Sequence, residues 1–266
     1  MKLAILILHY GNFRLTRRCL DSIGKLKFDK KKAVTFLINN TPEKKLPSLK
    51  KEIRIVTNNT NLGFAKGMNV GIKLILKDAA VTHILLLNND TVLPSDLLNI
   101  ISETAADIFA PVIKFKSVNN SWRYDGGGKV NFWTGRTTHL ETDSLPDPRQ
   151  FDTSNIDFVS GCCMFIKRKV FEKIGFLDED YFFYFEDVDF CLKARKAGFR
   201  LSVNPNYCLF HELGGTSGRW NNEAIRRNIS GNAIFIRKNL GLRQPVAYFY
   251  LFLLTIKIVI NRLFGK

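Results

Sequence analysis

The chain has 266 residues, of which 45% are apolar and 24% carry a charge. These ordinary proportions, in a chain long enough to bury a core without disulfides or a structural metal, exclude a disordered tail protein, a collagen-like repeat, a multi-pass membrane protein and a cysteine-stapled secreted module. The 40 Lys and Arg residues against 24 Asp and Glu give a net charge of +16, which attracts polyanions such as nucleic acid, anionic lipid and phosphorylated substrates.

The first half of the chain alternates strand-like and helix-like segments. Apolar runs predict strands at residues 3–8, 33–38, 53–57 and 84–87, and near-helical spacing predicts helices at 16–26 and 65–77. The first run is short and leads into His9-Tyr10-Gly11-Asn12 with no small-residue cleavage site, so it predicts a buried strand and not a signal peptide. Strands that alternate with helices imply βαβ units and a mostly parallel sheet.

The second half begins with a change in composition. Residues 115–155 are rich in Gly, Asn, Asp, Thr and Pro, and they predict an irregular stretch with short strands, not a separate domain. The apolar signal resumes at residue 157, and helices are predicted at 169–174 and 190–197.

The C-terminal segment has a character of its own. Residues 244–256 contain no charge and many Tyr, Phe, Leu and Ile, and Lys257 and Arg262 follow. A membrane span takes about 20 apolar residues, so the segment predicts a helix that lies in a membrane interface; a packing helix and a true span are the alternatives. We therefore expect a main domain over residues 1–240 and an apolar, basic helical segment over 241–266.

The cysteines indicate a reducing compartment. Their number is odd, and their spacing contains no CxxC pair or zinc-site pattern. They are Cys19, Cys162, Cys163, Cys191 and Cys208. Reduced thiols in a cytosolic protein are the simplest interpretation.

Short polar residues follow three of the predicted strands. They are His9 and Tyr10, then Asn39, and then Asn88, Asn89 and Asp90. Ligands of open parallel sheets bind at the carboxyl ends of the strands. A carboxylate placed as Asp90 is can hold Mg²⁺ together with substrate phosphates and water, although a loop Asp that caps a turn gives the same pattern.

The segment from Asn61 to Gly71 is dense in Gly and Asn. Glycine lets the backbone approach a ligand closely, and a helix that begins within the segment would offer its N-terminus to a phosphate. A loop followed by a packed helix that tolerates glycine is the alternative.

Two further motifs carry titratable side chains. Glu186, Asp187 and Asp189 repel one another, which raises at least one pKa unless a cation or a donor compensates. One of these carboxylates suits a general base for a sugar hydroxyl, whereas an acid-rich helix N-terminus is the structural alternative, with Asp189 as the structural member. His211 opens the motif His-Glu-Leu-Gly-Gly-Thr-Ser and can complete a metal site, although a lone histidine is more often structural.

In their order and spacing, these motifs resemble the family 2 glycosyltransferases of the GT-A fold, notably the rhamnosyltransferase-like branch. The segments are 61–71, 88–90, 181–192 and 211–217, and the resemblance covers roughly residues 3–240. It implies an α/β GT-A fold, a Rossmann-like and mostly parallel sheet flanked by helices. It also implies inverting transfer of a sugar from a nucleotide-diphosphate donor, dTDP- or UDP-linked with dTDP-rhamnose as one candidate, to a glycan or lipid-linked acceptor, with Mg²⁺ or Mn²⁺.

The resemblance also assigns roles to individual residues. Asp187 matches the catalytic base, and Glu186 and Gly161 fall on the acceptor side. Asp90 and His211 match the metal contacts. These roles agree with the chemistry, because a cation stabilises the charge of a leaving nucleoside diphosphate and one base on the opposite face gives inversion.

The donor side follows from the same resemblance. The residues expected to contact the nucleotide sugar are His9, Tyr10, Asn39, Asn61, Gly63, Phe64, Lys66, Asn69, Asn88 and Asn89. Asn88 stands where the metal motif of the family has its first Asp, and Asn39 stands where many members have Asp, so each removes one charge. Arg227 falls in a closing-segment motif and either contacts phosphate or packs.

Three alternatives are weighed against this reading. A nucleic-acid-binding module is disfavoured because no RNP-like, KH-like or zinc-finger signature is present. A nucleotidyltransferase would carry a basic, Gly-rich loop directly after the first strand, which this chain lacks. A non-catalytic paralogue that acts by interaction is suggested only by Asn39 and Asn88. We expect a cytoplasmic enzyme peripheral on the anionic inner face of the cell membrane, with no nucleic-acid partner and a homo-oligomer left open.

Overall fold

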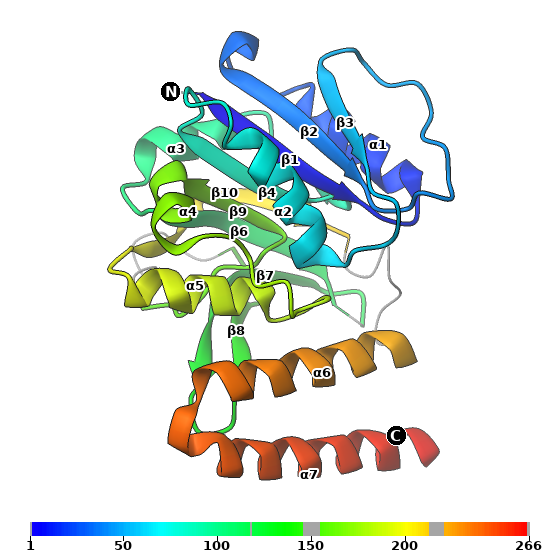
Figure 1. Cartoon of the computed structure of the whole chain (residues 1–266), viewed down its shortest axis with the longest axis vertical. Helices are drawn as coiled ribbons and strands as arrows, with labels where there is room; N and C mark the ends of the chain where they lie inside the picture. Colours follow the sequence, from blue (N-terminus) through cyan, green and yellow to red (C-terminus); the bar gives the residue numbers. More distant parts are fainter. Residues whose placement is uncertain (1, 118, 146–154, 213–220, 265–266) are drawn as a thin grey trace.

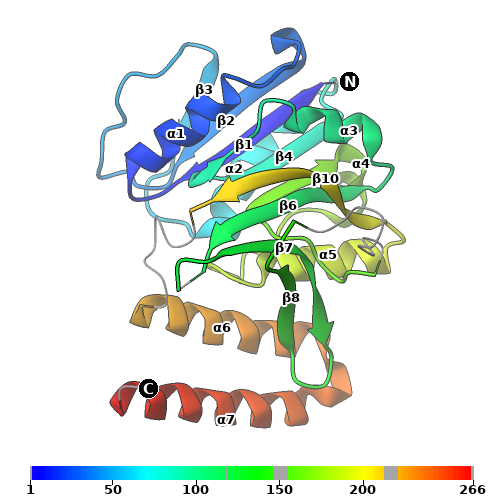
Figure 2. The same cartoon turned by 180° about the vertical axis from the view of Figure 1, so that it is seen from behind.

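The computed structural model of the chain describes residues 2–117, 119–145, 155–212 and 221–264. Over these ranges a ten-stranded sheet lies between two layers of helices (Figures 1 and 2). One face carries α1 (Phe13–Ile23) and α3 (Ile100–Glu103), and the other carries α2 (Phe64–Ile75), α4 (Arg168–Ile174) and α5 (Glu186–Lys196). Short 3-10 turns lie at η1 (Lys30–Lys32), η2 (Leu97–Asn99) and η3 (Gly241–Arg243).

Four parallel strands form one side of the sheet, in the order β3-β2-β1-β4. They are β1 (Leu3–His9), β2 (Ala33–Asn39), β3 (Ile53–Thr57) and β4 (His83–Asn88), within two residues of the predicted bounds. Alternate side chains of β1 enter two separate cores: Ala4, Leu6 and Leu8 pack beneath α2, and Leu3, Ile5 and Ile7 pack on the α1 side. Burial on both faces explains why this strand is a continuous apolar run.

The other side of the sheet is mixed. It contains β5 (Thr91–Val92), β6 (Ile108–Lys116), β9 (Cys163–Lys167) and β10 (Leu201–His211). β9 lies between β4 and β6 and is antiparallel to both, whereas β10 is parallel to β6. The chain enters β9 beside the carboxyl end of β4, where Cys163 pairs with Leu87. β9 therefore runs in the direction opposite to β4. The predicted parallel arrangement therefore holds for the first four strands and for the β6–β10 pair.

Part of the stretch predicted to be irregular with short strands forms a longer hairpin, made of β7 (Trp122–Asn131) and β8 (Arg136–Thr142). The glycines that suggested a loop serve close packing. A Cβ at Gly128 would lie 2.2 Å from the ring of Phe158. The tip of the hairpin reaches α6 (Asn222–Asn239), where Asn232 Nδ2 donates to the carbonyl oxygen of Gly135 at 2.6 Å.

The C-terminal helix α7 (Gln244–Leu263) lies alongside α6 at the bottom of the molecule in Figure 1. Ala247 and Leu251 are buried, while most of the other apolar side chains of the helix face outward. Within the described part of the chain, one stretch, Gly241–Arg262, is long and apolar enough to cross a membrane. The packing of α7 on α6 joins this segment to the rest of the fold.

Candidate active site

A cavity lies at the carboxyl ends of β1, β2 and β4, where the sequence predicted the donor to bind. Its lining includes six of the predicted donor contacts. These are Tyr10, Asn61, Gly63, Phe64, Asn88 and Asn89. The other side chains that line it are Leu8, Asn40, Phe182, Phe183 and Arg227.

Asn40, which the sequence analysis did not single out, organises this cavity. Its Nδ2 donates to Asn61 Oδ1 at 2.8 Å and to the carbonyl oxygen of Gly63 at 3.2 Å. Its Oδ1 accepts from Asn58 Nδ2 and from the backbone N–H of Leu62, both at 3.0 Å. The amide thereby fixes the loop before α2 against the end of β2 with both of its polar atoms satisfied.

Asn39 points elsewhere. It is buried, and its Oδ1 accepts a hydrogen bond from the backbone N–H of Thr41 at 3.1 Å, which forms an Asx turn. Successive side chains of a strand alternate between faces, so Asn40 and not Asn39 reaches the cavity. The alternation of β2 side chains between the two faces of the sheet, continued past Ile38, is the signal that distinguishes Asn39 from Asn40.

His9 is not among the cavity-lining side chains. It is buried against α1, with its Nδ1 2.7 Å from Thr16 Oγ1 and its ring edge-on to Phe13. Burial, aided by the charge of Lys44, lowers the pKa of His9 to about 4. Thr16 also accepts from Asn89 Nδ2 at 2.8 Å. His9 therefore contributes through Thr16, by holding Asn89 at the cavity wall.

The two predicted donor contacts on α2 also lie outside the lining. Lys66 is exposed on the helix surface. Asn69 is buried, and it donates to the carbonyl oxygen of Leu177 at 2.8 Å and accepts from the Leu177 N–H at 3.2 Å. Asn69 ties α2 to the segment that precedes α5.

The first N–H of α2 is already satisfied by protein. The backbone N–H of Phe64 donates to the carbonyl oxygen of Phe182 at 2.7 Å. Gly63 has a φ of +76°, and a Cβ there would lie 2.4 Å from that oxygen. Gly63 thus permits the close approach of the chain at Phe182, and the predicted phosphate contact at this N–H is already taken by a carbonyl.

The glycines further along α2 follow the structural alternative. A Cβ at Gly71 would lie 2.2 Å from a methyl group of Leu6, and one at Gly67 would lie 2.7 Å from a methyl group of Leu8. Both glycines let α2 pack closely on β1. The Gly-rich motif therefore divides into an N-terminal part at the cavity and a packed helix.

Asp90 and His211 lie close together, where Asp90 follows β4 and His211 ends β10. Antiparallel pairing of Thr91 with His211 aligns the end of β10 with β5, and it brings His211 Nε2 to 3.1 Å from Asp90 Oδ1. Both side chains are buried. Burial acts to lower the pKa of His211, but Cys162 and Asp90 outweigh it and raise the pKa well above its usual value. The remaining residues of the His211 motif, 213–217, lie outside the described residues.

The donor set of this pair fits a divalent cation. Carboxylate oxygen and the nitrogen of an imidazole that has released its proton together suit Mn²⁺, and Mg²⁺ accepts the carboxylate. Over the described ranges, no cluster of three or more His, Cys, Asp or Glu side chains forms a candidate metal site. A cation at Asp90 and His211 would therefore take its further ligands from phosphate oxygens and water, as cations in nucleotide sites do.

Asp187 is held at the N-terminus of α5. Its Oδ2 accepts from the backbone N–H of Gly161, and its Oδ1 accepts from the N–H of Val188, both at 2.8 Å. Burial raises the pKa of Asp187, and the two N–H donors and the charge of His139 act in the opposite direction. The carbonyl of Cys162, the residue after Gly161, accepts from the N–H of Asn88 at 2.9 Å, so Asp187 is tied to the donor cavity through residues 161–162.

The neighbouring acids behave differently from Asp187. Glu186 is 5% exposed, and its Oε2 finds no hydrogen-bond partner among the described residues. Burial and the charge of Asp187 raise the pKa of Glu186 well above its usual value. Asp189 instead accepts from Tyr181 Oη at 3.2 Å and from Asn239 Nδ2 at 2.7 Å, which is the structural role expected for it.

Arg227 supplies a cation to the cavity. It extends from α6, and its guanidinium lies 4.4 Å from the ring centroid of Phe182 and pairs with Glu223 at 2.9 Å. The structure shows the packing, on the ring of Phe182, and it also places Arg227 in the cavity lining, so contact with a phosphate stays a prediction.

The comparisons with known proteins show the family of the chain. A profile of the family described as "Glycosyltransferase like family 2" matches residues 15–228. The chain is 28% identical over 166 residues to the low-salt glycan biosynthesis hexosyltransferase Agl10 of Haloferax volcanii. The matched stretch covers 59% of this chain and 50% of that relative. It is 34% identical over 64 residues to the N-acetylglucosaminyl-diphospho-decaprenol L-rhamnosyltransferase of Mycobacterium tuberculosis, over 24% of this chain and 21% of the relative. The match thus spans half or less of the length of these relatives.

Solved structures agree on the fold. GalNAc-T7, crystallised with UDP, GalNAc and Mn²⁺, superposes with a TM-score of 0.63 at 13% identity, over 89% of this chain and 48% of that one. A likeness at this identity concerns the fold alone. The GT-A fold expected from the sequence is confirmed.

Proposed function

The chain belongs to glycosyltransferase-like family 2, and on this basis we propose that it transfers a sugar, with inversion, from a nucleotide-diphosphate donor to a hydroxyl of a glycan or lipid-linked acceptor. One observation carries the proposal: Asp187, the Asp90–His211 pair and the asparagine-lined cavity lie at one edge of the sheet. A general base, a cation site and a nucleotide cavity are the parts that such a displacement requires.

The residues of the chain divide the reaction between them. Asp187 takes the proton of the acceptor hydroxyl as the acceptor oxygen bonds to the anomeric carbon, and the bond from that carbon to the donor phosphate breaks. Asp90 and His211 would hold the Mg²⁺ or Mn²⁺ ion, which neutralises charge on the leaving diphosphate when bound. Arg227 supports the same charge from the cavity wall. dTDP- and UDP-sugars are the donors we propose, with dTDP-rhamnose as one candidate.

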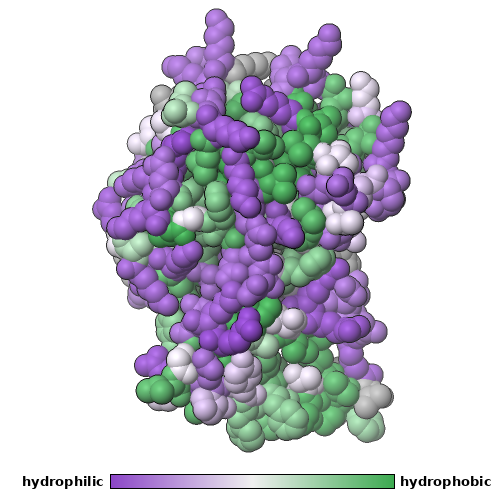
Figure 3. Space-filling model, in the orientation of Figure 1, coloured by the Kyte–Doolittle hydropathy of each residue, from purple (hydrophilic) through white to green (hydrophobic). Residues whose placement is uncertain are grey.

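The exposed face of α7 is the surface we propose to meet a membrane. The lower end of the molecule in Figure 3 is covered by apolar side chains, over the place where Figure 1 shows α7. The exposed apolar residues of this helix are Val246, Tyr248, Phe249, Phe252, Leu253, Ile256, Val259 and Ile260. With the net charge of +16, this surface supports a peripheral position on an anionic cytoplasmic membrane face.

A second cavity supports a lipid-linked acceptor. It measures about 340 Å³ and lies between α6 and α7, lined by Ile225, Asn228, Ile229, Ile258 and Arg262. Arg227, next to Asn228 on α6, faces the donor cavity. Helix α6 thus contributes residues to both the donor cavity and this second cavity.

The base assignment gives the direct test of this function. We would measure release of nucleoside diphosphate from UDP- and dTDP-sugars with Mn²⁺, for the wild type and for Asp187→Asn. The variant should lose about 100-fold or more of the turnover and still bind the nucleotide. Asp180→Asn is the matched control, because Asp180 lies on the surface before α5 in an ion pair with Lys238 at 2.7 Å. Full turnover by Asp187→Asn would refute the role of this carboxylate as the base.

A further inference from the structure

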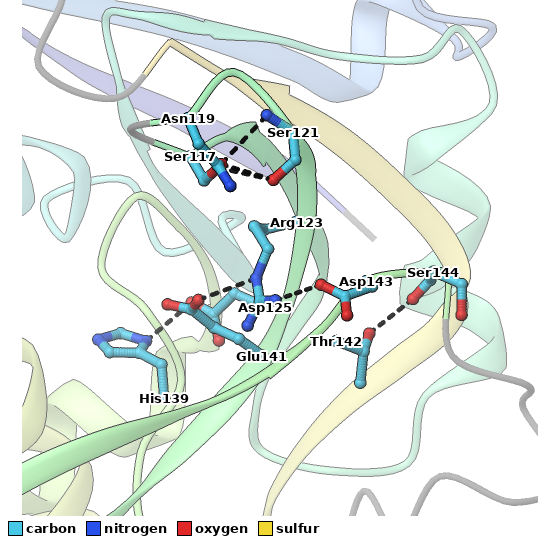
Figure 4. Close-up of polar contacts among 10 residues, drawn as sticks. All are labelled: Ser117, Asn119, Ser121, Arg123, Asp125, His139, Glu141, Thr142, Asp143 and Ser144. Carbon is cyan, nitrogen blue, oxygen red and sulfur yellow. Dashed lines mark hydrogen bonds and ion pairs between the residues drawn. The ribbon is translucent and has the colours of Figure 1, made fainter.

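A histidine that the sequence analysis did not single out lies beside the base. His139 on β8 has its Nδ1 2.8 Å from Asp125 Oδ2 on β7 (Figure 4). The Asp125 side chain is 8% exposed, and its other oxygen accepts from the N–H of Gly127 at 2.9 Å, so the carboxylate is fixed from both sides. The strand register shifts between Asp125 and Gly128, and such a bulge re-aims the side chains beside it.

A series of contacts leads from this pair to Asp187 through residues 158–161. Gly128, which is opposite His139 in the hairpin, exchanges hydrogen bonds with Phe158 at 3.0 and 3.3 Å. The His139 ring stands edge-on to the Phe158 ring, with centroids 5.2 Å apart. Three residues after Phe158, the N–H of Gly161 holds Asp187 Oδ2. His139 and Asp187 are close enough for each to shift the pKa of the other.

The charged groups around His139 favour its protonated form. The His139 side chain is 40% exposed. Its partial burial acts to lower the pKa, but the hydrogen bond and charge of Asp125, with Asp187 and Glu141, raise it to about 9. Arg123, the nearby cation of the hairpin, is engaged by Glu141 at 3.4 Å and by Asp143 (Figure 4). At neutral pH the imidazole therefore carries a positive charge on the side of Asp187.

Asp187 needs such a charge. It is flanked by Glu186, whose own carboxyl group is buried without a hydrogen-bond partner among the described residues, and burial works against the ionised form of both. A protonated Asp187 cannot accept the proton of the acceptor. Backbone N–H donors, those of Gly161 and Val188 among them, and the charge of His139 oppose protonation.

We propose that His139, oriented by Asp125, is a positioning residue that keeps Asp187 ionised for its role as the base. The proposal rests on the proposed function. His139 exchanges no proton in the reaction. The acceptor O–H bond breaks as its proton bonds to a carboxylate oxygen of Asp187, and the imidazolium of His139 stays protonated throughout. Asp125 acts one step further away, by holding the imidazole in its charged form and in place.

The interaction is measurable without any substrate. The chain has four histidines, and the imidazole signal of His139 in an NMR spectrum is identified by its loss in His139→Gln. We expect His139 to titrate near pH 9 in the wild type. Because electrostatic coupling is reciprocal, Asp187→Asn should lower that pKa, and Asp125→Asn should lower it further. Asp180→Asn should leave it unchanged. The same His139 titration in wild type and Asp187→Asn would overturn the proposal.

The pH dependence of donor turnover tests the consequence for the reaction. His139→Gln should move the acid limb of kcat/KM to higher pH by about one unit, the size of effect that one nearby opposite charge has, with the plateau retained. His139→Lys should restore the limb, because it returns a fixed positive charge. His83→Gln is the control, because His83 is at the start of β4 and the donor cavity is at the other end of that strand. Equal loss at every pH would contradict the proposal. If the wild type turns over no donor, the proposed function fails, and the NMR titration still decides whether His139 and Asp187 are coupled.

Discussion

His211 Nε2 lies 3.1 Å from Asp90 Oδ1, although 121 positions separate the two residues in the chain. The short antiparallel contact of β5 with β10 creates this proximity. It joins the carboxyl end of the parallel half of the sheet to the last strand. Both residues were assigned to the metal by the resemblance, and the fold brings them together as that assignment requires.

Asp90→Asn and His211→Ala should each remove the metal dependence of nucleotide binding. Loss of a carboxylate or an imidazole donor leaves the cation with only one protein ligand of this pair, which weakens the ternary complex about 10-fold or more. Calorimetric titration of each variant with the nucleotide, with and without Mn²⁺, measures the effect. Asp96→Asn is the matched control, since Asp96 is an exposed acid six residues further along the chain. Metal dependence equal to that of the wild type in either variant would contradict the assignment of that residue.

Asn40→Ala should destabilise the protein and weaken nucleotide binding. The substitution removes the acceptor of Asn58 Nδ2 and of the Leu62 N–H, at a cost of about 1–3 kcal/mol in the free energy of unfolding. Urea unfolding and nucleotide titration measure the two effects. Asn206→Ala, an exposed asparagine of β10, should change neither. Unaltered nucleotide affinity in a destabilised Asn40→Ala would restrict Asn40 to a structural role.

Glu186→Gln should raise stability at alkaline pH. The native pKa of Glu186 lies well above its unfolded value, so the folded state binds the extra proton and the wild type loses stability as the pH rises above the unfolded pKa. The slope is about 1.4 kcal/mol per pH unit between the two pKa values. Glutamine imitates the protonated side chain and removes this loss. Denaturant titrations at pH 5 and pH 8 should show a gap between variant and wild type that widens with pH, whereas a constant gap would show that Glu186 is ionised in the folded protein.

Substitution of Phe249 and Phe252 by Gln should release the protein from anionic vesicles. The two rings are 63% and 60% exposed, and each contributes about 1.5 kcal/mol or more if the helix inserts them among lipid chains. Sedimentation with phosphatidylglycerol vesicles should show at least about a 10-fold weaker affinity for each ring removed. Ile55→Gln changes an exposed apolar residue of β3, at the far end of the molecule from α7, and is the control. Unchanged vesicle binding would favour α7 as a packing surface.

The sequence predicted the parallel half of this fold well because continuous apolar runs such as Leu3–Leu8 have few other structures open to them. The β7–β8 hairpin was predicted only as short strands in an irregular stretch because its glycines disfavour strands, and the close approach of Phe158 explains the glycine at position 128. That contact spans 30 positions and has no local signature. Asp187 and its neighbours were identified from the order and spacing of the motifs along the chain, and not from local periodicity.

The site was predicted at the level of motifs and less well at the level of single side chains. Asn39 and Asn40 are adjacent and identical, so only strand alternation decides which faces the cavity. His9 follows the strand as Tyr10 does, yet its side chain turns to Thr16 on the other side of the sheet. His139 lies in a stretch that carried no motif, and it acquires its place through the bulge at Asp125. Long-range pairing decides each of these, and a single sequence does not display it.

Calorimetric titration of the full chain with UDP and with dTDP, each with and without Mn²⁺, tests the central claim most directly. The account predicts that one of the two nucleotides binds and that its affinity rises when Mn²⁺ is present, which would also limit the donor to that base. Binding that is indifferent to Mn²⁺, or no binding of either nucleotide by the folded protein, would contradict the proposed metal-assisted transfer from a UDP- or dTDP-sugar.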